Sequence, residues 1–285
     1  MHKVISAFIQ GSPQGIVWPV NCVTGRVRHN YDETSVSVID LEIVFEDDCL
    51  IGVNKPAGLL VHPSWITAAD EPTLMGLLKA YTGAPKLHTI HRLDRATSGI
   101  ILVGKTLEAT QHIQAQFLQR SINKTYLAAV RGWTQDAEII DYALVPKRDK
   151  FAEPMAQENP EAKEAVSAYR TLGRVELDIP IGRYPKARYS LVEVKPSTGR
   201  KHQIRRHMKH ILHPIVGDTK YGEGRHNRLF REHFELHRLL LMATELEFTH
   251  PTSEARLKLS ATVDRQVDEL FRRFGWQGLY PVAKT

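Results

Sequence analysis

The segment HRLDRATSGIILVGK, residues 91–105, decides the fold class. Its second half, 99–105, is a continuous apolar run, as expected of a strand that is buried on both faces. Its first half is polar and places Asp94 between Arg92 and Arg95 directly before that strand. We therefore expect a charged loop that leads directly into a buried strand.

Further strands are expected on both sides of this segment. Residues 41–56 have the pattern of two strands around an Asp47–Asp48 turn, and Pro56 ends the second of them. The same reasoning predicts strands at 124–132, 188–196, 239–248 and 256–261. Strands thus outnumber helices along the chain.

Helices are expected at four places: after Pro72, after the capping residue Thr106, after Gly199, and after Thr262 up to Gly275. In the helix after Gly199, the predicted buried stripe is Ile204, Met208, Ile211 and Leu212, and the predicted polar side carries Lys201, Arg205 and Lys209. Because strands and helices do not alternate, the sequence favours an α+β fold with a mostly antiparallel mixed sheet over a doubly wound fold.

Residues 1–40 differ from the rest, because Gly and Pro punctuate them and no periodicity persists. We interpret 1–40 as an N-terminal extension with at most short strands, and 41–285 as one catalytic domain. Residues 146–165 are polar and are expected to form a long loop.

Composition excludes several classes of protein. A chain of 285 residues with 42% hydrophobic residues can bury a substantial core, so disorder throughout is excluded. Cys22 and Cys49 are too few for a disulfide framework. No apolar run approaches the roughly 20 residues needed to span a bilayer, and the N-terminus lacks a secretory signal. We expect a cytoplasmic protein.

The positive charge is concentrated in one region. The formal net charge is +6, but residues 183–238 hold 14 Lys and Arg against 5 Asp and Glu, a balance of +9. Such a region favours a polyanionic partner, because neutralised phosphates release counterions. A solvated surface that binds nothing is the alternative.

Asp94 between two arginines has two interpretations. Nearby positive charge lowers the pKa of a carboxylate and suits a nucleophile or a base. An aspartate that caps a turn and pairs with arginine is the structural alternative.

Other chemistries lack their motifs. The chain has no G-x-S-x-G elbow, no Walker A loop and no G-x-G-x-x-G opening a βαβ unit. His207, His210 and His213 lack the further ligands and spacing of a zinc site, so they are expected on a basic RNA-facing or solvated surface.

HRLDRATSG at 91–99 resembles the signature of the RluA-type pseudouridine synthases. Four more blocks follow the order of that family: NKPAGLLVHP at 54–63, NKTYLAAVRG at 123–132, STGRKHQIRRH at 197–207 and HPIVGDTKYG at 213–222. Within the family, GRYPKARYSLVE at 182–193, NRLFREHF at 227–234 and FGWQGLYP at 274–281 resemble a tRNA-modifying subgroup.

The resemblance implies the pseudouridine synthase catalytic fold without an S4 domain, and uridine-to-pseudouridine isomerisation at U65 of tRNA. It makes Asp94 the essential carboxylate, Arg205 its partner, Tyr126 the active-site aromatic residue and Arg92 the residue that fills the gap left by the flipped uridine. Whether Asp94 attacks C1′, adds to C6 or removes a ribose proton stays open. The reaction requires no cofactor and no metal.

The expected partner is tRNA, and the protein is expected to be a monomer without a membrane or an obligate protein partner. Because side chains cannot read the deep groove of an A-form stem, recognition should rest on phosphates, 2′-hydroxyls and shape. Candidate contacts are Arg188, Lys201, Arg206 and Lys209, together with Lys186 and Arg228. The alternatives are a ribosomal-RNA pseudouridine synthase of the same family and an RNA-binding module without catalysis.

Overall fold

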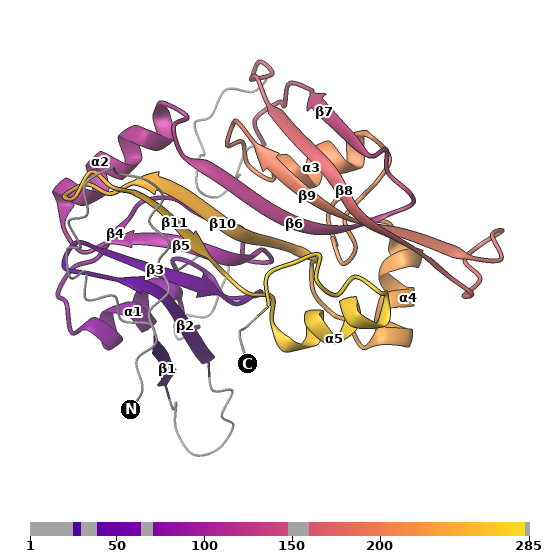
Figure 1. Ribbon diagram of the computed structural model, residues 1–285, viewed down its shortest axis with the longest axis horizontal. Coiled ribbons are helices and arrows are strands. Elements are labelled where there is room, and N and C mark those ends of the chain that lie inside the picture. The colour runs from indigo at the N-terminus through magenta and orange to yellow at the C-terminus, as the bar shows by residue number, and fades with distance from the viewer. Residues whose placement is uncertain (1–24, 30–38, 64–70, 148–159, 283–285) are drawn as a thin grey trace. The chain divides into compact units, whose positions relative to one another are not determined.

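A computed structural model of the chain describes residues 25–29, 39–63, 71–147 and 160–282 (Figure 1). They belong to two compact units. The first unit comprises the chain up to Asn123 together with Ala243–Thr262, and the second comprises Lys124–Met242 and the chain from Val263 onward. Most of the expected extension and residues 148–159 of the expected loop lie outside the described residues. The division into an extension and one catalytic domain stays a prediction.

The first unit is built on a sheet whose neighbouring strands follow the order β1 (Gly25–His29), β2 (Ile39–Glu46), β3 (Leu50–Lys55), β5 (Ser98–Gly104) and β10 (Leu241–Thr249). Two short strands complete it: β4 (His88–Thr89) pairs with β5, and β11 (Arg256–Ser260) pairs with β10. The β2–β3 hairpin turns at Asp47 and Asp48, as predicted. The prediction of a strand buried on both faces is confirmed as well, because every residue of β5 is buried.

Two capped helices accompany this sheet. Helix α1 (Leu74–Thr82) begins after Thr73, whose side chain accepts a hydrogen bond from the backbone N–H of Gly76. Helix α2 (Leu107–Leu118) begins after Thr106, which accepts from Ala109. Both helices were predicted. Ala109 and Ile113 of α2 pack with apolar residues of β5 and β10 in one core.

The second unit contains the strands β6 (Asn123–Arg131), β7 (Ala137–Asp141), β8 (Val166–Leu177) and β9 (Ala187–Pro196). They are neighbours in the order β6-β9-β8-β7, and each adjacent pair is antiparallel. The predicted α+β class with a largely antiparallel sheet is therefore confirmed. Strands β7 and β8 were not foreseen, because β7 is mostly exposed and β8 mostly half-buried, so neither shows an apolar pattern.

Three helices belong to the second unit: α3 (Gln203–His210), α4 (Gly224–Phe234) and α5 (Arg265–Arg273). Phe230 of α4 and Phe271 of α5 are fully buried in a core that Trp276 and Tyr280 complete. Gly275, the predicted end of the last helix, has a φ of 72°. Across the described parts of both units, no helix has the length and apolar character needed to cross a membrane.

The predicted buried stripe of α3 is partly wrong. Leu212 lies beyond the end of the helix with a φ of 65°, and its side chain is 72% exposed. Arg205, predicted on the polar side, is buried. Ile204 and Met208 are buried as predicted, but Gln203, Arg205 and His207 are buried beside them because their side chains find hydrogen-bond partners there.

His207 shows the same effect and corrects the expectation of a surface histidine. Its side chain is fully buried, with Nδ1 3.1 Å from Ser167 Oγ and Nε2 3.1 Å from the carbonyl oxygen of Tyr142. Burial lowers the pKa of His207. His210 is exposed, as expected, and its ring stacks on that of Tyr142 with centroids 3.6 Å apart.

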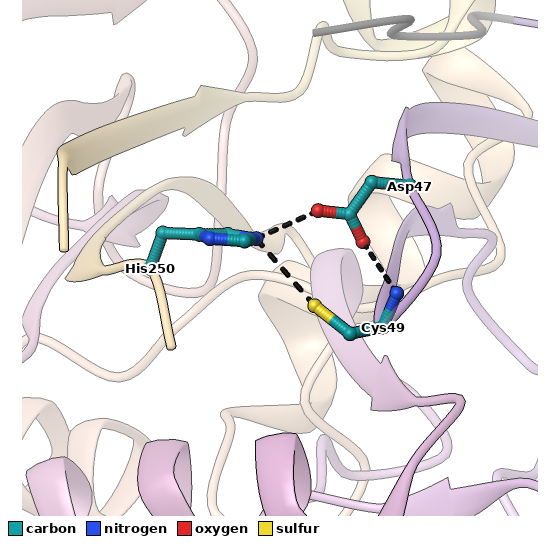
Figure 2. A group of neighbouring side chains, drawn as sticks. All are labelled: Asp47, Cys49 and His250. Carbon is teal, nitrogen blue, oxygen red and sulfur yellow. Dashed lines mark hydrogen bonds and ion pairs between the residues drawn. The ribbon is translucent and has the colours of Figure 1, made fainter. Parts of the chain in front are cut away.

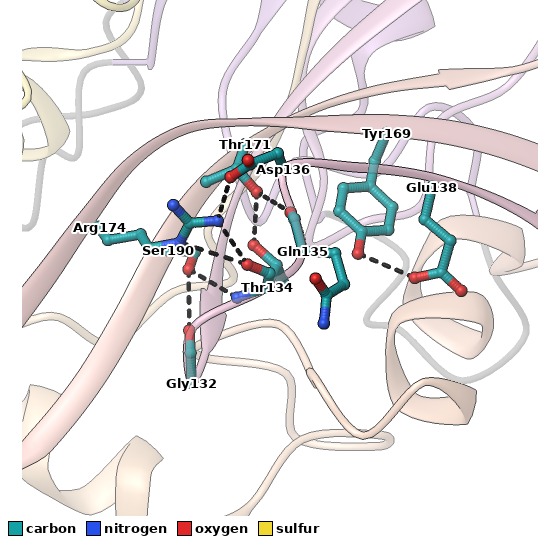
Figure 3. A network of polar contacts seen from close by, with 9 residues as sticks. All are labelled: Gly132, Thr134, Gln135, Asp136, Glu138, Tyr169, Thr171, Arg174 and Ser190. Atoms are coloured by element: carbon teal, nitrogen blue, oxygen red, sulfur yellow. Dashed lines mark hydrogen bonds and ion pairs between the residues drawn. The ribbon is translucent and has the colours of Figure 1, made fainter.

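A polar network fixes the connection between β6 and β7 (Figure 3). The backbone N–H of Thr134 donates to Ser190 Oγ, which itself donates to the carbonyl of Gly132. Arg174 donates to the carbonyl of Thr134, and the Thr134 hydroxyl lies 2.6 Å from that of Thr171. This connection is thereby held against β8 and β9.

Candidate active site

Asp94 lies in a tight turn directly before β5. The backbone N–H of Thr97 donates to the carbonyl oxygen of Asp94 over 3.0 Å, which closes the turn. The Asp94 side chain is half-buried. The turn leads directly into β5, which is buried along its whole length.

A buried lysine connects this turn to the loop after β3. Lys55 has no exposed surface, and its Nζ donates to the carbonyl oxygens of Pro56, Leu59 and Arg95. Gly58 and Arg95 add a backbone hydrogen bond of 2.8 Å between the same two loops. The NKPAG and HRLDRATSG blocks therefore form one continuous structure around Asp94. Sequence reasoning missed Lys55, although it stands in a quoted block.

The two arginines that flank Asp94 have different surroundings. Arg95 donates from Nε to the carbonyl of Gly58 and pairs with Glu71, so its guanidinium holds the loop. Arg92 is exposed. Burial and, secondarily, the charge of Arg92 lower the pKa of His62.

Gly99 allows β5 to approach β10 closely. Its φ is 108°, and a Cβ placed on it would lie 2.1 Å from the carbonyl oxygen of Ala243. No other residue type fits this position without moving the backbone. The glycine of the HRLDRATSG block thus has a packing function five residues after Asp94.

His91 and Leu93, which flank Arg92, have side chains directed into the first unit. His91 Nε2 accepts a hydrogen bond from the backbone N–H of Leu102, and its ring packs against Phe117. Leu93 is buried. The His91 side chain therefore attaches the loop to β5 and α2.

In the second unit, Arg205 forms a buried, bidentate ion pair with Asp218. Arg205 Nε donates to Oδ2 over 2.7 Å and Nη2 donates to Oδ1 over 2.8 Å. The backbone N–H groups of Lys220 and Tyr221 also donate to Asp218, and the Tyr221 ring lies beside the guanidinium. Burial alone would raise the pKa of Asp218, but these hydrogen bonds and the charge of Arg205 outweigh it and lower the pKa.

Asp218 was not among the predicted site residues. It lies in the quoted HPIVGDTKYG block, and the signal that could have found it is chemical. A buried guanidinium requires a carboxylate, and HPIVGDTKYG supplies one. The predicted pairing of Arg205 with Asp94 stays a prediction.

Tyr126 lies in β6 opposite Val194 of β9 and is half-buried, whereas its neighbours Thr125 and Leu127 are buried. The aromatic ring is therefore not enclosed in the core. Asp94 belongs to the first unit, and Tyr126 and Arg205 belong to the second. Their assembly into one catalytic group stays a prediction.

The predicted RNA contacts fall into two groups. Lys201 and Lys209 are exposed and Arg206 is half-buried. Arg188 is exposed but paired with Glu176, which Lys186 also contacts, so acidic side chains balance the charge there. Arg188 additionally lies over the ring of Trp133.

A separate cluster joins Asp47, Cys49 and His250, whose ligand atoms lie within 4.8 Å of one another (Figure 2). His250 Nε2 is 2.6 Å from Asp47 Oδ2 and 3.6 Å from Cys49 Sγ. These residue types could in principle hold a metal ion. Their separation of about two hundred positions along the chain hid the cluster from sequence reasoning.

The hydrogen bonds of His250 show whether the cluster suits a metal ion or a structural clasp, meaning a side-chain contact that holds two turns together. Its Nδ1 accepts from the backbone N–H groups of Thr252 and Ser253, so Nδ1 carries no proton. The proton of the neutral ring is then on Nε2, which donates it to Asp47. A metal at Nε2 would move this proton to Nδ1, against two N–H donors. The cluster therefore fits a clasp between the β2–β3 turn and the β10–β11 turn.

The sequence matches a family model described as RNA pseudouridylate synthase over residues 50–210. A tRNA pseudouridine synthase C from Vibrio parahaemolyticus is 45% identical over 238 residues, which cover 84% of this chain and 96% of that protein. The protein of the same name from Salmonella typhimurium is 46% identical over 241 residues, covering 85% of this chain and 92% of that protein.

Two solved structures share the fold of this chain. The structure of human RNA Pseudouridylate Synthase Domain Containing 4 covers 82% of this chain and 92% of its own, with a TM-score of 0.61 and 26% identity. Human RNA Pseudouridylate Synthase Domain Containing 1 shares the fold, with a TM-score of 0.60 and 24% identity over 88% of this chain and 100% of its own.

Proposed function

Because the chain belongs to the RNA pseudouridylate synthase family and is therefore a pseudouridine synthase, we propose that it forms pseudouridine in tRNA, at U65. The observation that carries this proposal is the identity of 45% with a tRNA pseudouridine synthase C over nearly the whole length of that relative. The matched region includes the blocks that hold Asp94, Tyr126 and Arg205.

In the proposed reaction, the N1–C1′ bond of the uridine breaks, the uracil turns, and a C5–C1′ bond forms. The proton at C5 is lost and N1 gains one, so the reaction is an isomerisation without a redox step. Asp94 acts as the ionised carboxylate at the reacting bond. The support for this role is its half-buried position in a turn that Lys55 and Arg95 hold in place.

Arg205 supplies the positive charge that this carboxylate needs. Its guanidinium is buried and fixed by Asp218, so its remaining N–H groups can meet a second carboxylate without a loss of side-chain freedom at the moment of reaction. Tyr126 offers a half-buried ring on which the uracil stacks, and its hydroxyl assists proton transfer at C5.

The uridine must leave its stem to react, at a cost of a few kcal/mol for unstacking. Arg92 is exposed and stands two residues before Asp94, and we assign it to the space that the flipped base leaves. Lys201, Arg206 and Lys209 contact the phosphates of the stem. Arg188 makes a weaker contribution, because Glu176 already pairs with it. The protein works in the cytoplasm as a monomer.

The test compares the wild type with Asp94→Asn on an unmodified tRNA transcript. We expect the variant to bind the transcript and to form no pseudouridine. Asp48→Asn is the matched control, because it removes an exposed carboxylate from the same unit. Isomerisation by Asp94→Asn would refute the role of Asp94.

The site of modification needs its own experiment. Replacement of U65 by cytidine in the transcript should abolish the product, and mapping of pseudouridine by primer extension would show any other target. A ribosomal-RNA transcript should remain unmodified. Modification of that RNA in preference to tRNA would favour the ribosomal alternative.

A further inference from the structure

Two sequence blocks that supply no catalytic residue to the proposed reaction lie next to each other in the second unit. The first, 182–193, begins in a tight turn in which Ile181 and Tyr184 exchange two backbone hydrogen bonds. The second, 227–234, lies in α4. A Cβ placed on Gly182 would lie 2.7 Å from Nη1 of Arg225, so the turn and the start of α4 are in contact.

The buried side chain of Tyr189 connects the two blocks. Its hydroxyl oxygen lies 2.8 Å from Nδ1 of His226, and its ring packs edge-on against Phe230 with centroids 4.9 Å apart. Tyr189 and Phe230 are fully buried. The turn and α4 therefore present one fixed outer surface. The residues of this α4 surface are Arg183, Tyr184, Arg225, Arg228 and Arg231.

The α4 surface carries unbalanced positive charge. Arg225, Arg228 and Arg231 recur at three-residue spacing, are exposed, and cover one face of the helix. Among the described residues, no carboxylate lies within ion-pair distance of the four arginines of the surface. Lys186 and Arg188 differ from them, because Glu176 pairs with both and Asp178 also pairs with Lys186.

An exposed aromatic ring completes the surface. Tyr184 is 56% exposed, and Arg183 donates to its hydroxyl over 2.9 Å while lying against its ring. A ring in this setting can stack on a base or a ribose, and arginines bind phosphates in bidentate fashion. The combination fits RNA.

We propose that the α4 surface binds the phosphate backbone of the tRNA substrate. This inference rests on the proposed function, and it adds a recognition surface to the catalytic residues. Because A-form stems are recognised through phosphates and shape, a fixed row of arginines suits such a stem. The surface contributes to binding of the tRNA and not to the chemical step.

The test uses two double variants that remove the same amount of charge. Arg225→Ala with Arg228→Ala alters the proposed surface. Arg265→Ala with Arg272→Ala is the control, because these exposed arginines of α5 already pair with Glu269 and Asp268. Alanine favours helices, so both variants should keep the fold. Binding of an unmodified tRNA transcript is measured by filter retention at several KCl concentrations.

We expect the α4 double variant to raise Kd about tenfold at physiological salt and to reduce the slope of log Kd against log salt by roughly 1.5 to 2. The control should change Kd less than about twofold, since its charges are already paired. With saturating tRNA, kcat of the α4 variant should equal that of the wild type. Equal Kd values and slopes for the two double variants would overturn the proposal.

Tyr184→Ala tests the aromatic part separately. It should raise Kd about fivefold without a change in the salt slope, because stacking releases no counterions. An unchanged Kd would show that Tyr184 does not contribute to RNA binding. Failure of the wild type to form pseudouridine would instead contradict the proposed function. That failure is measured as missing pseudouridine in the tRNA, independently of the binding constants.

Discussion

Arg205 and Asp218 share two nearly parallel hydrogen bonds of 2.7 and 2.8 Å in the interior of the second unit. Arg205 is 6% exposed, and Asp218 is buried as well. The pair fixes the plane of the guanidinium, because two of its five N–H groups are held by one carboxylate. Asp218 thus sets the orientation in which Arg205 can meet any further acceptor.

Asp218→Asn should therefore impair both the fold and the reaction. The substitution leaves a buried guanidinium without its carboxylate, which costs about 3 to 5 kcal/mol of unfolding free energy. In the fraction that folds, Arg205 loses its fixed orientation, and we expect kcat to fall by at least about a hundredfold. Urea denaturation and single-turnover formation of pseudouridine measure the two effects.

Asp136→Asn is the control for this change. Asp136 also pairs with an arginine, Arg174, but its side chain is 93% exposed. An exposed pair contributes about 0 to 1 kcal/mol, so the control should retain stability and activity. Comparable losses in the two variants would show that burial of the Arg205 pair has no special importance.

The same pair shows where sequence reasoning succeeds and where it ends. The apolar run 99–105 predicted β5, and Thr106 predicted the start of α2, because both depend on neighbouring residues. The partner of Arg205 depends on a loop thirteen residues away. An ion pair of this kind has no periodicity that a sequence pattern can display.

Burial was predicted less well than the elements themselves. The helix α3 was expected, but the assignment of its faces relied on hydrophobicity alone. Arg205 and His207 are buried because Asp218 and Ser167 bind them, whereas Leu212 is exposed because the helix has already ended. Strand β7 escaped prediction for the opposite reason, since most of its residues face solvent.

Gly99→Ala should be strongly destabilising. The new Cβ would lie 2.1 Å from the carbonyl oxygen of Ala243, at a φ of 108°. The backbone would have to move, and we expect a loss of about 3 kcal/mol or more, together with a displaced catalytic loop and reduced turnover. Gly58→Ala is the control, because Gly58 has a φ of 88° with nothing within 4 Å. It should cost only about 1 to 2 kcal/mol.

Cys49 should react slowly with alkylating reagents. Burial and the negative charge of Asp47 raise the pKa of Cys49 from 9.0 to about 11. At pH 8 the thiolate fraction is therefore about a hundredfold smaller than in the unfolded chain, and the rate falls accordingly. Iodoacetamide labelling of a Cys22→Ser variant, native and in urea, isolates this thiol. Equal rates in the two states would contradict the clasp geometry.

We expect His226 to make the folded protein less stable under mildly acidic conditions. Its side chain is 14% exposed, and its Nδ1 lies 2.8 Å from the hydroxyl oxygen of Tyr189. Burial lowers the pKa of His226 from 6.5 to about 4, although Glu223 acts in the opposite direction. Between these two values the unfolded chain binds a proton that the native protein does not bind. Unfolding is therefore favoured as the pH falls from 6.5 toward 4.

From this difference in proton binding, His226 should lower the unfolding free energy by about 2 kcal/mol between pH 7 and pH 5. His226→Gln removes the titrating group, so its unfolding free energy should depend less on pH by about that amount. His233→Gln, an exposed position on the same helix, should retain the dependence of the wild type. Urea titrations at the two pH values provide the comparison. If His226→Gln and the wild type lose the same stability between pH 7 and pH 5, the burial of a neutral His226 is not the cause of the pH dependence.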